Sequence, residues 1–346
     1  MKKVLGLVLT LALSLTFTGC ASKTNNNGDS AKAGSTEKQI VMKIGHTQIE
    51  QSPRHAVSLK IKEYVEKESN GRIAVQIYPN SQLGNSKEQV EGLQTGSIEM
   101  VVFPTTSVTD FQPIFTLPDI PYLFPTDQEK LLKLYKSDAF KTFMAAGDDK
   151  GFKALATLFE GYATISSKIP VTEASQLKDM KLRIIGSNIA KTYYTNLGVP
   201  PNVIAFSEVY TSLQTGRINS LDIPISQMYE NKFYEVCENM TETKHFALTS
   251  LVMVNKSWYD ALPGDLQKII ADAAEMAAPE AANVVNATTE KARKDMPGVQ
   301  FHQPTDDLVN QLKEQTGKME EEYVKVNGEK GKQILDGIKQ AVQVQN

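Results

Sequence analysis

The chain has 346 residues, of which 41% are apolar and 22% charged, a balance typical of globular proteins long enough to form two domains. Its net charge of −3, with no basic run after residue 3, argues against nucleic acid as a partner. Two cysteines, Cys20 and Cys237, are too few for a disulfide scaffold or a zinc ribbon.

The first 19 residues have the features of a secretory signal peptide. Lys2 and Lys3 precede an apolar stretch, residues 4–17, that is too short for a mature membrane-spanning helix. The stretch leads into Thr18-Gly19-Cys20, which resembles a bacterial lipobox, where small residues precede a cysteine that becomes lipidated. The alternative is an ordinary signal peptide with a chance cysteine. We predict cleavage after residue 19, lipidation of Cys20 and an extracytoplasmic protein anchored to the membrane through this lipid.

Residues 20–38 follow as a tether, because they are rich in Ser, Asn, Gly and Lys and nearly free of apolar side chains. The folded part then begins near Gln39. Its first elements are a strand around residues 41–44, a helix that starts at Ser52-Pro53, and an alternating strand over residues 73–77.

The next helix starts at Ser86, which has capping-box spacing to Gln89, and ends at Gly96. A strand over residues 99–103 completes a β-α-β-α-β order, the pattern of an α/β sheet domain.

A second unit of similar build is predicted further along the chain. It has a strand at residues 182–185, a helix capped by Ser187, a strand that leads to Phe206, and a helix capped by Ser207. The tetrapeptide Leu-Gln-Thr-Gly ends a helix in both units, at residues 93–96 and 213–216. This shared placement indicates two lobes.

The C-terminal third is mostly helical. A strand over residues 249–255 is followed by a long Ala-rich helix opened by Pro263-Gly264. Helical stretches at about 306–323 and 329–342 close the chain, and we expect them to pack across both lobes.

Motifs for catalysis and metal binding are absent from the sequence. No two of the four histidines have metal-ligand spacing, and there is no G-x-S-x-G, no phosphate-binding glycine loop and no C-x-x-C. We therefore predict no metal, no cofactor and no enzymatic activity. Cys237 is expected to be a half-buried free thiol.

Five segments carry a family resemblance through their order and spacing. They are IYPNSQLG (77–84), LQTGSIEM (93–100), LPDIPYLF (117–124), LKDMKLR (177–183) and FSEVYTSLQTG (206–216). Together they resemble the substrate-binding subunit of TRAP transporters, the tripartite ATP-independent periplasmic family, over nearly all of residues 40–325.

The resemblance implies a class II periplasmic-binding-protein-like α/β fold, a two-lobe clamp with a long bridging helix and a helical C-terminus. We assign residues 39–160 plus 249–288 to lobe one. Residues 161–248 plus 289–346 form lobe two and the bridging helices. Such a protein captures a small organic carboxylate by lobe closure and delivers it to TRAP membrane subunits, its expected partners.

Arg183 lies at the position of the family's carboxylate-binding arginine, and a guanidinium donates two parallel hydrogen bonds to a carboxylate. Phe206 matches an aromatic residue that packs on the ligand, although it also fits an ordinary core position. In relatives an asparagine stands where this chain has Ile223, and a second arginine stands where it has Ala163. These departures favour a ligand with fewer charged oxygens or with an apolar portion.

Further contacts are expected from loops on both lobes, with simple loop chemistry as the alternative. They are Thr47, Gln48, Thr105 and Thr106 from lobe one, and Tyr162, Asp222 and Gln227 from lobe two. Asp222 faces either solvent or a cationic ligand group. Arg54 and His55, one turn into the first helix, are expected to be exposed, with contact to the cleft as the alternative. His245 is expected to make a structural hydrogen bond.

Two other functions stay open at the sequence level. A ligand sensor that reports to a membrane receptor would have the same binding lobes. An enzyme on this fold would need a nucleophile paired with a base, and the sequence has no such pair.

Overall fold

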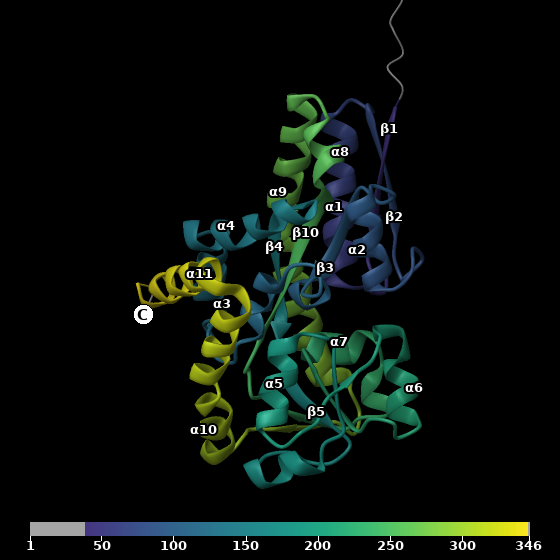
Figure 1. Cartoon of the computed structure of the whole chain (residues 1–346). Coiled ribbons are helices and arrows are strands. Elements are labelled where there is room, and N and C mark those ends of the chain that lie inside the picture. Colours follow the sequence, from purple (N-terminus) through teal and green to yellow (C-terminus); the bar gives the residue numbers. More distant parts are fainter. Residues whose placement is uncertain (1–38, 345–346) are drawn as a thin grey trace, which may run out of the picture. The chain divides into compact units, whose positions relative to one another are not determined.

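The computed structural model describes residues 39–344, which form one compact unit (Figure 1). The predicted signal peptide, Cys20 and the tether lie outside the described residues. Within residues 39–344, no helix is both long and apolar enough to span a membrane. Two α/β lobes make up the unit, as predicted, and each is built around one sheet.

The sheet of the first lobe has five strands. In spatial order they are β2 (Ile73–Tyr78), β1 (Ile40–Gly45), β3 (Met100–Pro104), β10 (Ala247–Asn255) and β4 (Phe152–Tyr162). The first three are mutually parallel, whereas β10 is antiparallel to both β3 and β4. Helix α1 (Pro53–Glu68) packs against α9 (Gly264–Asp295), and the two run side by side in Figure 1.

The sheet of the second lobe has six short strands. Their order is β11 (Gln300–His302), β9 (Asn239–Thr241), β5 (Thr164–Ser167), β8 (Ser220–Ile223), β6 (Leu182–Ile184) and β7 (Asn202–Val203). Strand β6 is parallel to both β7 and β8. Three helices follow strands of this sheet: α5 (Asn188–Asn196), α6 (Val209–Gln214) and α7 (Ile225–Glu230).

The remaining helices lie mainly in the first lobe and the C-terminal part. They are α2 (Ser86–Thr95), α3 (Gln128–Tyr135), α4 (Asp138–Met144), α8 (Lys256–Asp260), α10 (Asp306–Glu314) and α11 (Thr316–Gln343). Short 3-10 segments include η1 (Thr105–Ser107), η2 (Pro113–Asp119) and η5 (Phe206–Glu208). Helix α11 is interrupted at Gly328, whose φ of 60° and ψ of −151° are not helical. This break falls between the two predicted C-terminal stretches.

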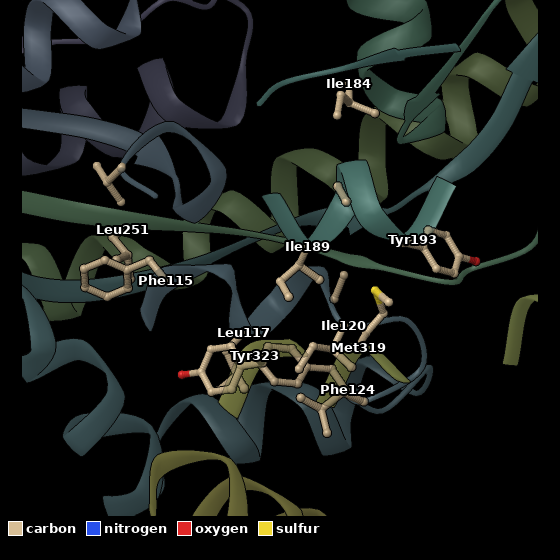
Figure 2. Packing of buried hydrophobic residues seen from close by; sticks show 14 of the residues in the cluster. Phe115, Leu117, Ile120, Phe124, Ile184, Ile189, Tyr193, Leu251, Met319 and Tyr323 are labelled. Atoms are coloured by element: carbon tan, nitrogen blue, oxygen red, sulfur yellow. The ribbon is translucent and has the colours of Figure 1, made fainter. Parts of the chain in front are cut away.

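One hydrophobic cluster extends from the first sheet to the second. Figure 2 shows Ile189 of α5 beside Leu117 and Ile120 of the η2 region, with Met319 and Tyr323 of α11 close by. Each of these side chains is at most 2% exposed. Burial of an apolar side chain of this size stabilises the fold by roughly 1.5–3 kcal/mol. The cluster therefore joins α5 to the η2 region and α11.

Predicted helix starts at Ser52-Pro53, Ser187 and Pro263-Gly264 agree with the structure, and two others differ. Ser52 caps α1 by accepting a 3.3 Å hydrogen bond from the His55 amide, with Pro53 in the first turn, as predicted. The capping box of α2 is formed by Asn85 and Glu88, one residue before the predicted pair. Both pairs have the same spacing, and Gly84, at a φ of +97°, sets the turn that selects the earlier one.

The predicted cap at Ser207 is wrong. Residues 206–208 form the 3-10 turn η5, and α6 begins after Glu208 without a side-chain cap. Cys237 is fully buried rather than half-buried. Burial raises the pKa of its thiol to about 12, so it is not a nucleophile at neutral pH.

Candidate functional site

A cavity lies where the two lobes meet. It is lined by residues at the carboxyl ends of β1, β3, β6 and β8, and by the first residues of β10. Loops at the carboxyl ends of parallel strands are the usual place for ligands in α/β folds. The cavity volume is about 130 Å³. A cavity of roughly 150 Å³ holds benzene, so the space suits a small organic molecule.

The first lobe contributes neutral polar groups to this cavity. Thr47 and Gln48 follow β1, and Thr105 and Thr106 follow β3, and all four line the wall. Gln48 Oε1 and Thr106 Oγ1 are buried and have no hydrogen-bond partner among the described residues. A buried polar atom without a partner costs free energy, so both atoms are suited to meet a bound ligand.

Arg183 is the central basic group of the second lobe's wall. It lies on β6, is 4% exposed, and donates from Nε to the Ile204 carbonyl over 3.0 Å. Within residues 39–344 its guanidinium forms no ion pair, and its Cζ lies 5.9 Å from the centre of the Phe206 ring. Burial lowers the pKa of Arg183 to about 10, opposed by the negative charge of Asp222. The group is therefore cationic at neutral pH and has its terminal nitrogens left to bind an anion.

Asp222 ends a chain of hydrogen bonds behind the cavity. Thr243 Oγ1 lies 2.6 Å from His245 Nδ1, and His245 Nε2 lies 2.8 Å from the Tyr194 hydroxyl, which donates to Asp222 Oδ2. Because Tyr194 uses its proton on Asp222, His245 Nε2 must donate to the Tyr194 hydroxyl, and the same nitrogen lies 3.3 Å from Asp222 Oδ1. His245 thus has the structural role predicted for it, and the chain orients Asp222.

Arg54 also lines the cavity, and the expectation that it is exposed is wrong. It is 3% exposed, and it donates from Nε and Nη2 to the two oxygens of Glu160, over 2.7 and 3.0 Å. Gln227 adds a 3.1 Å hydrogen bond to the same carboxylate. The partners lie 106 residues apart in the chain, so local sequence does not reveal the pair.

The backbone at Gly161 explains how the chain turns between Glu160 and Tyr162. Gly161 has a φ of +108°, and a Cβ at this position would lie 2.7 Å from Cβ of Pro224. A residue with a side chain does not fit this conformation or this close approach. Glu160 turns to Arg54, whereas the Tyr162 hydroxyl donates to the Pro125 carbonyl over 3.1 Å.

All of the predicted contact residues except Tyr162 line the cavity, including Phe206, Ile223 and Gln227. Ala163, where the resemblance implies a second arginine, lines it in place of Tyr162.

Asp119, the last residue of η2, was not predicted to line the cavity. This side chain lines the cavity at 8% exposure, and its Oδ2 has no hydrogen-bond partner within the described part of the chain. Burial raises the pKa of its carboxyl to about 7. The signal in the sequence was an acid placed between Leu117-Pro118 and Ile120-Pro121, an otherwise apolar run.

Among residues 39–344 there is no group of three or more His, Cys, Asp or Glu side chains that could hold a metal ion. His46 and His55 form a pair, with 3.2 Å between Nε2 and Nδ1.

Comparison with known proteins places these features in a family. The sequence profile of the bacterial extracellular solute-binding proteins, family 7, matches residues 44–326. The C4-dicarboxylate-binding periplasmic protein DctP of Rhodobacter capsulatus is 34% identical over 273 residues, which cover 77% of this chain and 81% of that protein. The ectoine/5-hydroxyectoine-binding periplasmic protein UehA of Ruegeria pomeroyi is 31% identical over 294 residues, covering 81% and 84%.

The fold is also similar to solved structures. A TRAP periplasmic solute-binding protein from Desulfovibrio salexigens, with bound orotic acid, superposes with a TM-score of 0.86 at 27% identity, covering 89% of this chain and all of that one. The periplasmic ectoine-binding protein of the TeaABC TRAP transporter of Halomonas elongata gives a TM-score of 0.84 at 26% identity, covering 88% and 99%.

Proposed function

Because this chain belongs to family 7 of the bacterial extracellular solute-binding proteins, the DctP family of TRAP transporters, we propose that its inter-lobe cavity binds the carboxylate of its solute through Arg183. The protein is an extracytoplasmic binding protein for small organic acids, not an enzyme. It serves transport, and the membrane subunits of a TRAP transporter receive its solute.

A single observation carries the proposal: Arg183 is buried, lines the cavity and has no ion-pair partner in the described part of the chain. A buried cation without a counter-ion is costly, and a bound carboxylate would remove that cost. Bidentate hydrogen bonds from a guanidinium would also fix the orientation of the solute.

Lobe closure provides the mechanism of capture. Thr47, Gln48, Thr105 and Thr106 approach the solute from the first lobe, and Arg183 and Phe206 from the second. A solute that contacts both walls at once stabilises the closed state relative to the open one. The hydrogen bond from Gln227 on α7 to Glu160 on β4 is a contact that the same closure would use.

We further propose that the mature protein is anchored to the membrane through lipid on Cys20, with residues 21–38 as the tether. The motif at residues 18–20 supports this anchor. Labelling with palmitate should mark the wild type and not the Cys20→Ser variant. Equal labelling of the two would contradict the anchor.

Calorimetric titration of the purified protein with a panel of small organic acids tests the proposed site. At least one acid should bind, and Arg183→Leu should abolish or strongly weaken that binding. Arg217→Leu is the matched control, because Arg217 is 60% exposed and pairs with Glu208 at the surface. Equal affinity of the Arg183→Leu variant and the wild type would reject the proposed site.

A further inference from the structure

The charges around the cavity do not favour an anion of high charge. Two basic side chains, Arg54 and Arg183, line it, and so do two acidic ones, Asp119 and Asp222. No other Lys, Arg or His of residues 39–344 lines the wall. The positive charge available to a solute therefore depends on whether each arginine is already paired with a carboxylate of the protein.

Arg54 already has a carboxylate partner within the protein. Its Nε and Nη2 donate to the two oxygens of Glu160, a residue with no exposed surface, so this carboxylate balances its charge. Arg183 is thus the one lining cation without a carboxylate partner in the described part of the chain. The amino end of α5, at Ser187 and Ala190, also borders the cavity and adds about half a positive charge.

The two acids limit what this positive charge can hold. Asp222 lies near enough to Arg183 to oppose the effect of burial on its pKa. Asp119 forms no ion pair within residues 39–344 and faces the same space. A second carboxylate on the solute would meet these acids in a cavity of about 130 Å³, without a cation of its own.

The rest of the wall is neutral. Ile184, Ile204, Phe206, Ile223 and Phe246 give it an apolar surface. On the opposite side, the unpartnered Gln48 Oε1 and Thr106 Oγ1 suit hydroxyl or amide groups of a solute.

Building on the proposed function, we infer that the cavity selects a monocarboxylate whose other polar groups are neutral, and that it rejects dicarboxylates of the same size. This selectivity differs from that in the name of the Rhodobacter capsulatus relative. It rests on the one unpaired cation and the two lining acids.

Calorimetry with matched acids tests the inference on the wild-type protein. 2-Methylbenzoate is compared with phthalate, and 3-hydroxybutyrate with malate, since in each pair a carboxylate replaces a methyl group. In the pair that binds, the monocarboxylate should bind at least tenfold more tightly. A dicarboxylate that binds as tightly as its partner, or more tightly, would overturn the inference and leave the proposed function intact.

Two isosteric variants test the role of the acids. At pH 8, above the raised pKa of Asp119, Asp119→Asn and Asp222→Asn should each narrow the difference in affinity between the members of the pair, because each then removes a negative charge from the wall. Melting of the unliganded variants checks that they fold. If neither variant narrows the difference, the charge argument is wrong. If no acid in the panel shows binding that depends on Arg183, the proposed function itself fails.

Discussion

Arg54 and Arg183 occupy opposite walls of one cavity, and they are buried to nearly the same extent, at 3% and 4% exposure. They differ in their partners. Glu160 accepts two hydrogen bonds from Arg54, whereas Arg183 donates one to the Ile204 carbonyl and forms no ion pair within the described residues. Burial alone therefore does not identify a binding residue.

The difference shows that the two arginines stabilise different states of the protein. The pair of Arg54 and Glu160 is satisfied without a solute, so it contributes to the fold. Arg183 has no carboxylate partner within the described residues until a solute supplies one, so it contributes to binding. Four predictions test whether Arg54 contributes to stability and Arg183 to binding.

The largest effect is expected from Arg54→Leu. It leaves Glu160 buried and without its cation, which should lower the free energy of unfolding by about 3–5 kcal/mol. Denaturant unfolding measures this loss. The double variant Arg54→Leu, Glu160→Leu should recover most of it, because no buried charge then remains. A single variant as stable as the wild type would contradict the structural role of Arg54.

Arg183→Leu should weaken solute binding without lowering stability, the reverse of the effect expected from Arg54→Leu. It removes a charge that has no carboxylate partner in the folded protein, so stability without solute should not fall. The free energy of solute binding should weaken by about 2–5 kcal/mol. Calorimetry and thermal melting measure the two quantities on the same sample. Loss of stability without loss of affinity would assign Arg183 to the fold.

The free energy of unfolding is expected to depend on pH through Glu230, whose pKa is influenced by Arg54. Both oxygens of Glu230 are buried and lack hydrogen bonds within residues 39–344. Burial, reinforced by the negative charge of Glu160 and opposed by Arg54, raises the pKa of Glu230 from 4.5 to about 8. The folded protein thus holds a proton that the unfolded chain releases, so stability should fall as pH rises from about 4.5 to 8.

The fall in unfolding free energy should be on the order of 2 kcal/mol, after allowance for partial exposure. Glu230→Gln should reduce the slope across this window, most clearly above pH 7, where the raised pKa of Asp119 contributes less; denaturant unfolding at a series of pH values measures the slope. An unchanged slope in the variant would show that Glu230 does not titrate there.

The smallest effect is expected from Phe206→Leu. The ring of Phe206 lies 5.9 Å from the Arg183 guanidinium and lines the cavity. Loss of the cation–π contact and of apolar surface should weaken solute binding by about 1 kcal/mol. Calorimetry should detect this change, with Phe233→Leu, behind Phe206, as the comparison. A stronger loss from Phe233→Leu would indicate core packing rather than ligand contact.

Much of the fold follows from local sequence. Ser52-Pro53 marks the start of α1, and Pro263-Gly264 marks the start of the 32-residue α9. The repeated Leu-Gln-Thr-Gly correctly indicated two lobes of similar build. These features depend on caps and short-range periodicity, which adjacent residues determine.

The site was predictable only in part, because its remaining features depend on distant contacts. Arg183 and Phe206 were found through the family resemblance, and both line the cavity. The burial of Arg54 depends on Glu160, 106 residues away, and on the backbone conformation of Gly161. Asp119 reaches the cavity through the packing of η2 against α5, which no periodicity in its own segment specifies.

A crystal structure with a bound monocarboxylate would test the central claim most directly. We predict that both carboxylate oxygens lie about 2.7–2.9 Å from the terminal nitrogens of Arg183, with the body of the solute between Phe206 and Gln48. A carboxylate bound elsewhere, with Arg183 still without an anionic partner, would contradict the account.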